Sequence, residues 1–187
     1  MNRIFTLPNG ITCLRIIGAT ALLGLPPLSV SFFILYTLCG FSDVLDGWVA
    51  RLTRQQSEFG AKLDSLSDLL FYAVMLGKIF PLLWTLLPKE IWIAVSAILV
   101  IRILSYVTAA IRYKRFASLH TYLNKATGLA LFSVPYCLNR PWGIGYCAFV
   151  CVVGALASTE ELIIHLRSAR YTADTKTLWH IHKTKQQ

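Results

Sequence analysis

Six apolar segments alternate with short polar or proline-containing connections along the chain. Stretches such as "LFYAVMLGKIFPLLWTLL" and "IWIAVSAILVIRILSYV" contain almost no polar position, so a helix formed there is hydrophobic on every side. Several segments are shorter than the roughly 20 residues of a typical membrane span, which keeps a soluble helical bundle as an alternative. A soluble bundle needs polar helix faces, which these stretches lack. We therefore predict an all-α integral membrane protein with six transmembrane helices, at about residues 11–25, 30–50, 59–80, 91–111, 122–138 and 142–164.

Prolines set several of the predicted boundaries. Proline has no backbone N–H and disrupts a helix interior, so the first segment is expected to stop at Pro26 and Pro27. By the same rule the third helix is expected to end at about Phe80, with Pro81 and Pro88 bracketing the following turn.

Composition supports the membrane prediction and adds an orientation. Hydrophobic residues make up 56% of the chain and charged residues only 14%, while the formal net charge is +9. The basic residues are dispersed among apolar runs, which favours anionic lipid headgroups over nucleic acid as their partner. Lysine and arginine are enriched in cytoplasmic loops. With both termini cytoplasmic, the outer turns hold only Lys89 and Arg140, with Lys78 near the outer end of the third segment.

The inner loops, helix ends and tail then contain Arg3, Arg51, Arg54, Lys62, Arg112, Lys114, Arg115, Lys125, Arg167, Arg170, Lys176, Lys183 and Lys185. This asymmetry predicts an N-in, C-in topology in the cytoplasmic membrane. We expect one transmembrane domain over residues 1–187, with a polar cytoplasmic tail from about residue 166 and no cleavable signal peptide.

Four aspartates stand out in this apolar chain. Asp43 and Asp46 lie near the end of the second segment, and Asp64 and Asp68 lie near the start of the third. Spacings of three and four residues place each pair on one helix face. The short polar connection predicts that the two helices are antiparallel neighbours, so the acidic faces are expected to meet. Like charges at the membrane edge are costly unless cations neutralise them. All-oxygen ligands suit Mg²⁺, Mn²⁺ or Ca²⁺ better than zinc.

The surroundings of the aspartates suggest phosphate chemistry. Two divalent ions bridged by carboxylates form a clamp for a diphosphate, and Arg51 can bind a phosphate through two hydrogen bonds. Gly47 and Gly60 remove side chains where a ligand or a neighbouring helix comes close. A purely structural role is the alternative, because aspartate near a helix N-terminus favours the helix dipole. That explanation does not extend to Asp43 and Asp46, near the C-terminal end of their helix.

These residues also carry a family resemblance. Asp43-x-x-Asp46-Gly47-x-x-Ala50-Arg51, then eight residues, Gly60, three residues, Asp64, three residues and Asp68, resembles the motif of the CDP-alcohol phosphatidyltransferases. The segment "LPNGITCLRI" at residues 7–16 resembles the opening of phosphatidylglycerophosphate synthases, and other features resemble phosphatidylserine synthases. The resemblance implies transfer of a phosphatidyl group from CDP-diacylglycerol to an alcohol, with release of CMP, by a homodimeric membrane enzyme of phospholipid biosynthesis whose active site faces the cytoplasm.

The resemblance also implies roles for individual residues. Asp43, Asp46 and Asp64 would hold one Mg²⁺ or Mn²⁺ ion, and Asp43, Asp64 and Asp68 a second. Asp64 and Asp68 would be catalytic, with Asp68 as the proton acceptor for the attacking hydroxyl. The residues implied to contact the CDP moiety are Pro8, Asn9, Gly47, Arg51, Ser57 and Gly60.

The acceptor alcohol is ambiguous in the sequence. "LDSLSDLL" at residues 63–70 resembles phosphatidylserine synthases, whereas phosphatidylglycerophosphate synthases usually have proline and lysine where this chain has Ser65 and Leu69. Against serine, the cations Arg102, Arg112 and Lys125 suit a phosphorylated acceptor, although Arg112 is equally explained as a topological anchor. We expect glycerol 3-phosphate, with serine or another polar alcohol as the alternative.

Two other function classes fit less well. A UbiA-type prenyltransferase also binds a diphosphate through Mg²⁺ and aspartates, but such chains are longer and carry two separated motifs. A small cation transporter would use acidic residues without requiring Gly47, Arg51 and Gly60 at these spacings.

Overall fold

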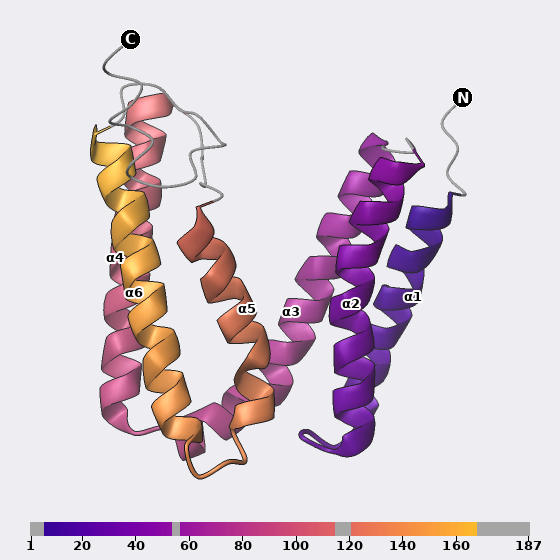
Figure 1. Cartoon of the computed structure of the whole chain (residues 1–187), viewed down its shortest axis with the longest axis horizontal. Coiled ribbons are helices and arrows are strands. Elements are labelled where there is room, and N and C mark those ends of the chain that lie inside the picture. Colours follow the sequence, from indigo (N-terminus) through magenta and orange to yellow (C-terminus); the bar gives the residue numbers. More distant parts are fainter. Residues whose placement is uncertain (1–5, 54–56, 115–120, 168–187) are drawn as a thin grey trace. The chain divides into compact units, whose positions relative to one another are not determined.

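The computed structural model describes residues 6–53, 57–114 and 121–167. Within these ranges the chain is all-helical and contains no strand, as the apolar pattern predicted. The predicted tail lies outside the described residues beyond residue 167. The helices are α1 (Leu7–Ala21), η1 (Leu22–Gly24, a 3₁₀-helix), α2 (Val30–Leu52), α3 (Glu58–Leu86), α4 (Lys89–Tyr113), α5 (Tyr122–Cys137) and α6 (Gly143–Arg167). Figure 1 labels α1 to α6.

Five of these helices are long and apolar enough to cross a membrane: α1 together with η1, α2, α3, α4 and α6. Helix α5 is shorter, with 16 residues. Many large apolar side chains point outward, and Ile34, Leu76, Ile103 and Val152 are each more than half exposed. Lipid tails can cover such surfaces, whereas water cannot do so favourably. The architecture is consistent with a multi-pass membrane protein, and the N-in, C-in topology stays a prediction.

Two helix boundaries differ from the sequence prediction because of proline. Helix α1 begins at Leu7 rather than near residue 11, with Thr6 as its N-cap and Pro8 in its first turn. Proline is well tolerated there, because the first N–H groups of a helix have no intrahelical partner. The predicted stop before Pro81 is wrong, since α3 continues through Pro81 to Leu86. Helices in membranes tolerate internal proline better than the soluble-protein rule suggests.

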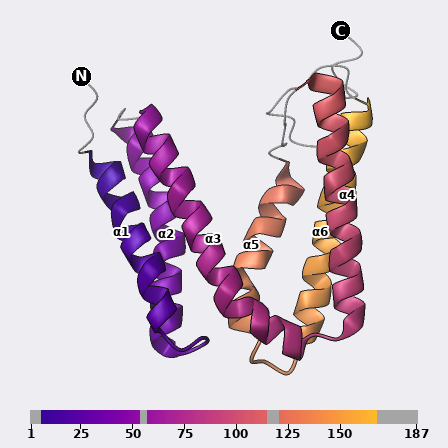
Figure 2. The ribbon, with the colours of Figure 1, turned by 180° about the vertical axis from the view of Figure 1, so that it is seen from behind.

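The chain forms two compact units, residues 1–85 and 86–187. In the first unit α1 and α2 lie side by side, as Figures 1 and 2 show. A Cβ added at Gly18 would lie 2.8 Å from Cys39 Sγ, so the glycine allows the two helices to approach closely. Helix α3 joins them through Phe71, whose ring stacks on Tyr36 at 5.6 Å between centroids. This packing fixes the faces of α2 and α3 that carry the aspartates.

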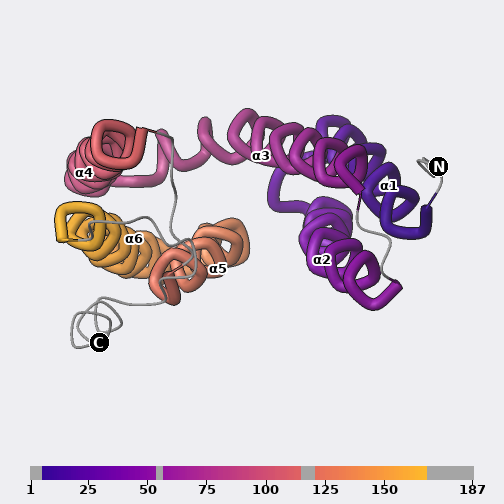
Figure 3. Tube along the Cα trace, turned by 90° about the horizontal axis from the view of Figure 1, so that it is seen from above, coloured from indigo at the N-terminus to yellow at the C-terminus, as the bar shows by residue number. Residues whose placement is uncertain are grey.

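In the second unit α6 packs along both α4 and α5, and Figure 3 shows α4 and α6 as neighbours. The buried apolar residues of this unit include Val134 on α5 and Val150 and Ile164 on α6. The same helices bury a charged residue, because Glu161 on α6 has no exposed surface. A fully buried carboxylate among apolar helices needs a cationic or hydrogen-bonding partner.

Candidate active site

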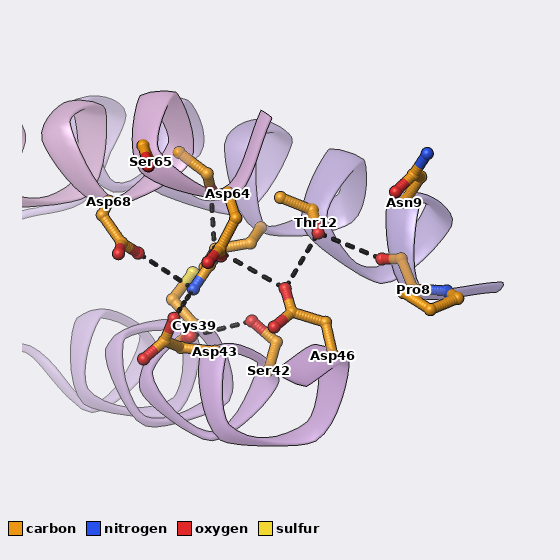
Figure 4. Close-up of polar contacts among 12 residues, drawn as sticks. Pro8, Asn9, Thr12, Cys39, Ser42, Asp43, Asp46, Asp64, Ser65 and Asp68 are labelled. Carbon is orange, nitrogen blue, oxygen red and sulfur yellow. Dashed lines mark hydrogen bonds and ion pairs between the residues drawn. The ribbon is translucent and has the colours of Figure 1, made fainter. Parts of the chain in front are cut away.

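The structure brings the two pairs of aspartates together within the first unit. In Figure 4, Asp64 and Asp68 point from α3 toward Asp43 and Asp46 on α2. One carboxylate oxygen from each of Asp43, Asp64 and Asp68 can be chosen so that all three lie within 4.8 Å of one another. This convergence follows from the three- and four-residue spacings of the aspartates and from the antiparallel arrangement of α2 and α3. That these aspartates bind a metal ion stays a prediction.

Arg15 on α1 lies at the centre of the carboxylates, and sequence reasoning assigned it no role. Its Nη1 donates to Asp43 and lies 3.1 Å from an Asp68 oxygen. Its Nη2 donates to Asp64 and lies 3.3 Å from an Asp46 oxygen. Its Nε donates to Ser67 Oγ at 2.8 Å. One buried guanidinium therefore links α1 to both helices that carry the aspartates.

The exposure of the carboxylates divides them into two kinds. The side chains of Asp43, Asp64 and Asp68 are 48%, 44% and 40% exposed, whereas that of Asp46 is 5% exposed. Thr12 Oγ1 lies 2.9 Å from Asp46 Oδ2 and donates to it or to the Pro8 carbonyl, which lies 3.0 Å away. Three aspartates are thus open to a ligand from solution, whereas Asp46 is buried against Thr12 and Arg15.

The donor set fits a divalent metal ion. With all four carboxylates ionised, the cluster carries a charge of −4, and Arg15 contributes +1, which leaves −3. Hard cations with oxygen ligands, such as Mg²⁺ or Mn²⁺, match both this residual charge and these ligand atoms. The clustered, partly exposed oxygens of Asp43, Asp64 and Asp68 offer such an ion three ligands.

A cavity of about 210 Å³ adjoins the aspartates within the first unit. Two of the carboxylates contribute to its wall, those of Asp46 and Asp64. All six residues predicted to contact the CDP moiety line the same cavity: Pro8, Asn9, Gly47, Arg51, Ser57 and Gly60. Thr12, Ala50 and Ala61 complete the lining. The sequence motif therefore defines one continuous concave surface, formed by α1, α2 and the start of α3.

The two motif glycines have different surroundings. A Cβ at Gly60 would lie 2.9 Å from Asn9 Oδ1 and 3.1 Å from Ser57 Oγ, which is too close without movement of those side chains. A Cβ at Gly47 would have only Arg51 Nη1 nearby, at 3.9 Å. A methyl group at position 60 would thus displace the Asn9 or Ser57 side chain where α3 approaches α1. Among the described residues, only Arg51 comes within 4 Å of a Cβ at Gly47, at an ordinary contact distance.

The residues predicted to bind the acceptor lie in the second unit. Arg102 Nη1 donates to Asn124 Oδ1 at 2.9 Å and lies 3.2 Å from Glu161 Oε2, while Asn124 Nδ2 also donates to Glu161 at 3.1 Å. Arg112 Nη1 donates to the Leu166 carbonyl at 2.6 Å, and Lys125 is exposed. Sequence reasoning missed Glu161 and Asn124. An acidic residue inside a predicted span was the available signal for Glu161.

Comparisons with known proteins identify the family to which the chain belongs. A family model for CDP-alcohol phosphatidyltransferase matches residues 5–160. A CDP-diacylglycerol–serine O-phosphatidyltransferase of Methanocaldococcus jannaschii is 43% identical over 74 residues, which are 40% of this chain and 34% of that protein. A CDP-diacylglycerol–glycerol-3-phosphate 3-phosphatidyltransferase of Pseudomonas fluorescens is 28% identical over 176 residues, covering 87% of this chain and 89% of the relative.

A third relative, the CDP-diacylglycerol–glycerol-3-phosphate 3-phosphatidyltransferase of Cereibacter sphaeroides, is 33% identical over 76 residues and matches over 32% of its length. The chain therefore spans about a third of two of these relatives and nearly the whole of the other. No solved structure matches it. Because the family model covers residues 5–160 of the 187, the chain belongs to the CDP-alcohol phosphatidyltransferase family.

Proposed function

We propose that the protein transfers a phosphatidyl group from CDP-diacylglycerol to a small polar alcohol, releasing CMP, in phospholipid biosynthesis. The observation that carries the proposal is that carboxylates of the aspartate cluster and the glycine and arginine positions of the motif line the same cavity. The relatives are named as phosphatidyltransferases that use CDP-diacylglycerol, which supports the same donor here.

The aspartates have the central role in this proposal. Asp43, Asp46, Asp64 and Asp68 would hold two divalent ions, Mg²⁺ or Mn²⁺, which would supply charge stabilisation for the diphosphate and the leaving CMP. The oxygen of the acceptor hydroxyl attacks the phosphorus that bears the diacylglycerol, and Asp68 accepts the proton of that hydroxyl. The bond from that phosphorus to the CMP oxygen breaks, and CMP leaves with the electron pair. The partly exposed Asp68 carboxylate is reachable by an acceptor from solution.

The nucleotide lies in the cavity of the first unit. Arg51 on the cavity wall is exposed and offers a planar cation for a phosphate oxygen. Gly47 lies on the same wall, and the described residues do not crowd it, which leaves room for the ligand backbone. Asn9 and Ser57 add polar atoms near Gly60 for the rest of the CDP moiety. The acyl chains remain among the lipids.

Glycerol 3-phosphate is the acceptor that we favour. The Pseudomonas fluorescens relative, named for this acceptor, aligns over nearly the whole chain, and Arg102, Arg112 and Lys125 provide cations for a phosphorylated alcohol. Serine is the second candidate. The relative named for serine has the higher local identity, 43% over 74 residues, and the motif carries Ser65 and Leu69.

The membrane setting completes the proposal. The protein is a homodimer in the cytoplasmic membrane with N-in, C-in topology, and its active site opens on the cytoplasmic side. This orientation follows from the distribution of lysine and arginine along the chain. It places the aspartate ends of α2 and α3 where a water-soluble nucleotide and acceptor can reach them.

A labelled-acceptor assay tests the activity. Purified protein in lipid nanodiscs receives CDP-diacylglycerol, Mg²⁺ or Mn²⁺, and one labelled alcohol from a panel containing glycerol 3-phosphate and serine. We expect phosphatidylglycerophosphate and stoichiometric CMP, both abolished by chelator and by Asp64→Asn. Formation of phosphatidylserine instead assigns the second candidate. Absence of CMP release with every acceptor overturns the proposed function.

A further inference from the structure

We propose that Arg15 is a built-in counter-cation of the aspartate cluster that competes with divalent ions for the carboxylates. It would hold the cluster together before metal binding and weaken the affinity for the incoming ion. The inference rests on the proposed function in one respect, because it takes the cluster to be the metal site.

All three guanidinium nitrogens of Arg15 are engaged. Nη1 contacts Asp43 and Asp68, Nη2 contacts Asp64 and Asp46, and Nε contacts Ser67. The Arg15 side chain is only 1% exposed, whereas three of its four carboxylate partners are 40–48% exposed. The guanidinium therefore covers the inner side of the cluster, and the side open to solution is left to an incoming ion.

The competition follows from charge and geometry. A guanidinium keeps its proton in proteins, so the positive charge of Arg15 is permanent. Asp43 and Asp64 are the two carboxylates expected to ligate both metal ions, and they are also the two that accept the most direct hydrogen bonds from Arg15. An ion bound to these oxygens lies beside the guanidinium in a partly desolvated site, where like charges repel. Such coupling is reciprocal. The bound ion weakens the contacts of Arg15 with the carboxylates, and Arg15 weakens the binding of the ion by the same free energy.

Arg15 also supplies stability that a metal ion can replace. It is the residue of α1 that reaches carboxylates on both α2 and α3, at separations of 28 to 53 residues along the chain. Removing one partner from a buried charge network is destabilising because uncompensated charges remain. Without Arg15, four carboxylates face one another until a divalent ion binds. The stability of the first unit then depends on metal more strongly than in the natural protein.

The test uses two effects of opposite sign: loss of Arg15 should tighten Mn²⁺ binding and lower the stability of the metal-free protein. Arg15→Met keeps a long side chain but removes the charge. Substrate-free protein in nanodiscs is titrated with Mn²⁺, and free Mn²⁺ is followed by electron paramagnetic resonance. We expect the Mn²⁺ dissociation constant to fall by at least about fivefold, in the range of ordinary coupling between sites. In chelator the variant should unfold at a lower temperature than the natural protein, and Mn²⁺ should raise its Tm by more.

Lys62→Met is the matched control, since it removes the same charge from an exposed position on α3 without a place in the cluster. Its Mn²⁺ affinity should change by less than about twofold, as expected for a screened surface charge. Arg15→Lys is the second variant if Arg15→Met does not fold. A lysine ammonium cannot contact four carboxylates through a planar fork, so its Mn²⁺ affinity should also exceed that of the natural protein.

Unchanged or weaker Mn²⁺ binding in both Arg15 variants, with normal binding by the natural protein, overturns the competition and leaves the proposed function standing. Such a result would identify Arg15 as a structural residue only. Failure of Mn²⁺ and Mg²⁺ to bind any of these proteins overturns the metal site itself, and with it both proposals.

Discussion

Gly60 on α3 lies so close to Asn9 on α1 that a Cβ at position 60 would sit 2.9 Å from the Asn9 side-chain oxygen. Asn9 is buried, with 6% of its surface exposed, so its amide has little room to retreat except into the cavity. We expect Gly60→Ala to displace this amide and to weaken Mg²⁺-dependent CMP binding about tenfold, equal to about 1.4 kcal/mol. Calorimetric titration of CMP measures the change.

Gly77→Ala provides the control for this substitution. Gly77 lies in the same helix, and a Cβ added there meets nothing within 4 Å. Both variants gain the helix propensity of alanine, but only the Cβ at position 60 meets Asn9 and Ser57. Equal CMP affinities for the two variants would contradict the role given to the close approach.

Gly47→Ala tests whether the ligand itself comes close to α2. In the part of the chain that the structure describes, the nearest atom to the added Cβ is Arg51 Nη1 at 3.9 Å, an ordinary contact that does not oppose the methyl group. Alanine in a helix interior is favoured over glycine by roughly 0.5–1 kcal/mol, so the Tm should stay the same or rise. We nevertheless expect the KM for CDP-diacylglycerol to rise about tenfold, because the methyl group enters the proposed nucleotide space. A variant with unchanged KM would place the nucleotide elsewhere.

The sequence predicted the helices and the convergence of the aspartates because both depend on local spacing. Residues three and four apart share a helix face whatever surrounds them, and a short connection leaves two helices few alternatives to antiparallel packing. Arg15 was missed for the opposite reason. Its five partners come from positions 28 to 53 residues away, and no pattern within α1 indicates which helix that residue faces.

The helix boundary at Pro81 and the partners of Arg102 in the second unit also depend on surroundings that local sequence patterns do not indicate. The predicted stop at Pro81 used a rule for helices in water, and α3 instead continues to Leu86 in a chain whose outer surfaces are apolar. Arg102 was recognised as a costly charge inside a span, but its partners Asn124 and Glu161 lie on two other helices. Tertiary contacts of this kind carry no local signature.

Glu161 is expected to position Arg102 for the acceptor. The Glu161 carboxylate has no exposed surface and holds Arg102 Nη1 at 3.2 Å, while the Arg102 side chain remains 30% exposed. Glu161→Gln removes the buried charge that fixes this guanidinium. We expect the KM for the acceptor to rise about tenfold and the KM for CDP-diacylglycerol to stay within about twofold. Steady-state kinetics with each substrate varied in turn separates the two constants.

Glu90→Gln is the matched control, because Glu90 is an exposed acidic residue in the first turn of α4 in the same unit. Equal effects on both KM values in Glu161→Gln, accompanied by a lower Tm, would indicate a general loss of packing. In that case Glu161 stabilises the second unit without any specific bearing on the acceptor.

Asp68→Asn separates proton acceptance from substrate binding. Asparagine has nearly the same shape and keeps an oxygen for Arg15 Nη1, which lies 3.1 Å from the aspartate, but it does not take up a proton. We expect kcat to fall at least about 100-fold, the usual lower range for loss of a general base, with little change in CMP affinity. Asp43→Asn should weaken Mn²⁺ binding more than Asp68→Asn does, because Asp43 is expected to ligate both ions and Asp68 only one. If Asp68→Asn binds substrate and turns over at nearly the natural rate, the proton goes to another group, and Asp68 serves only as a ligand or as a partner of Arg15.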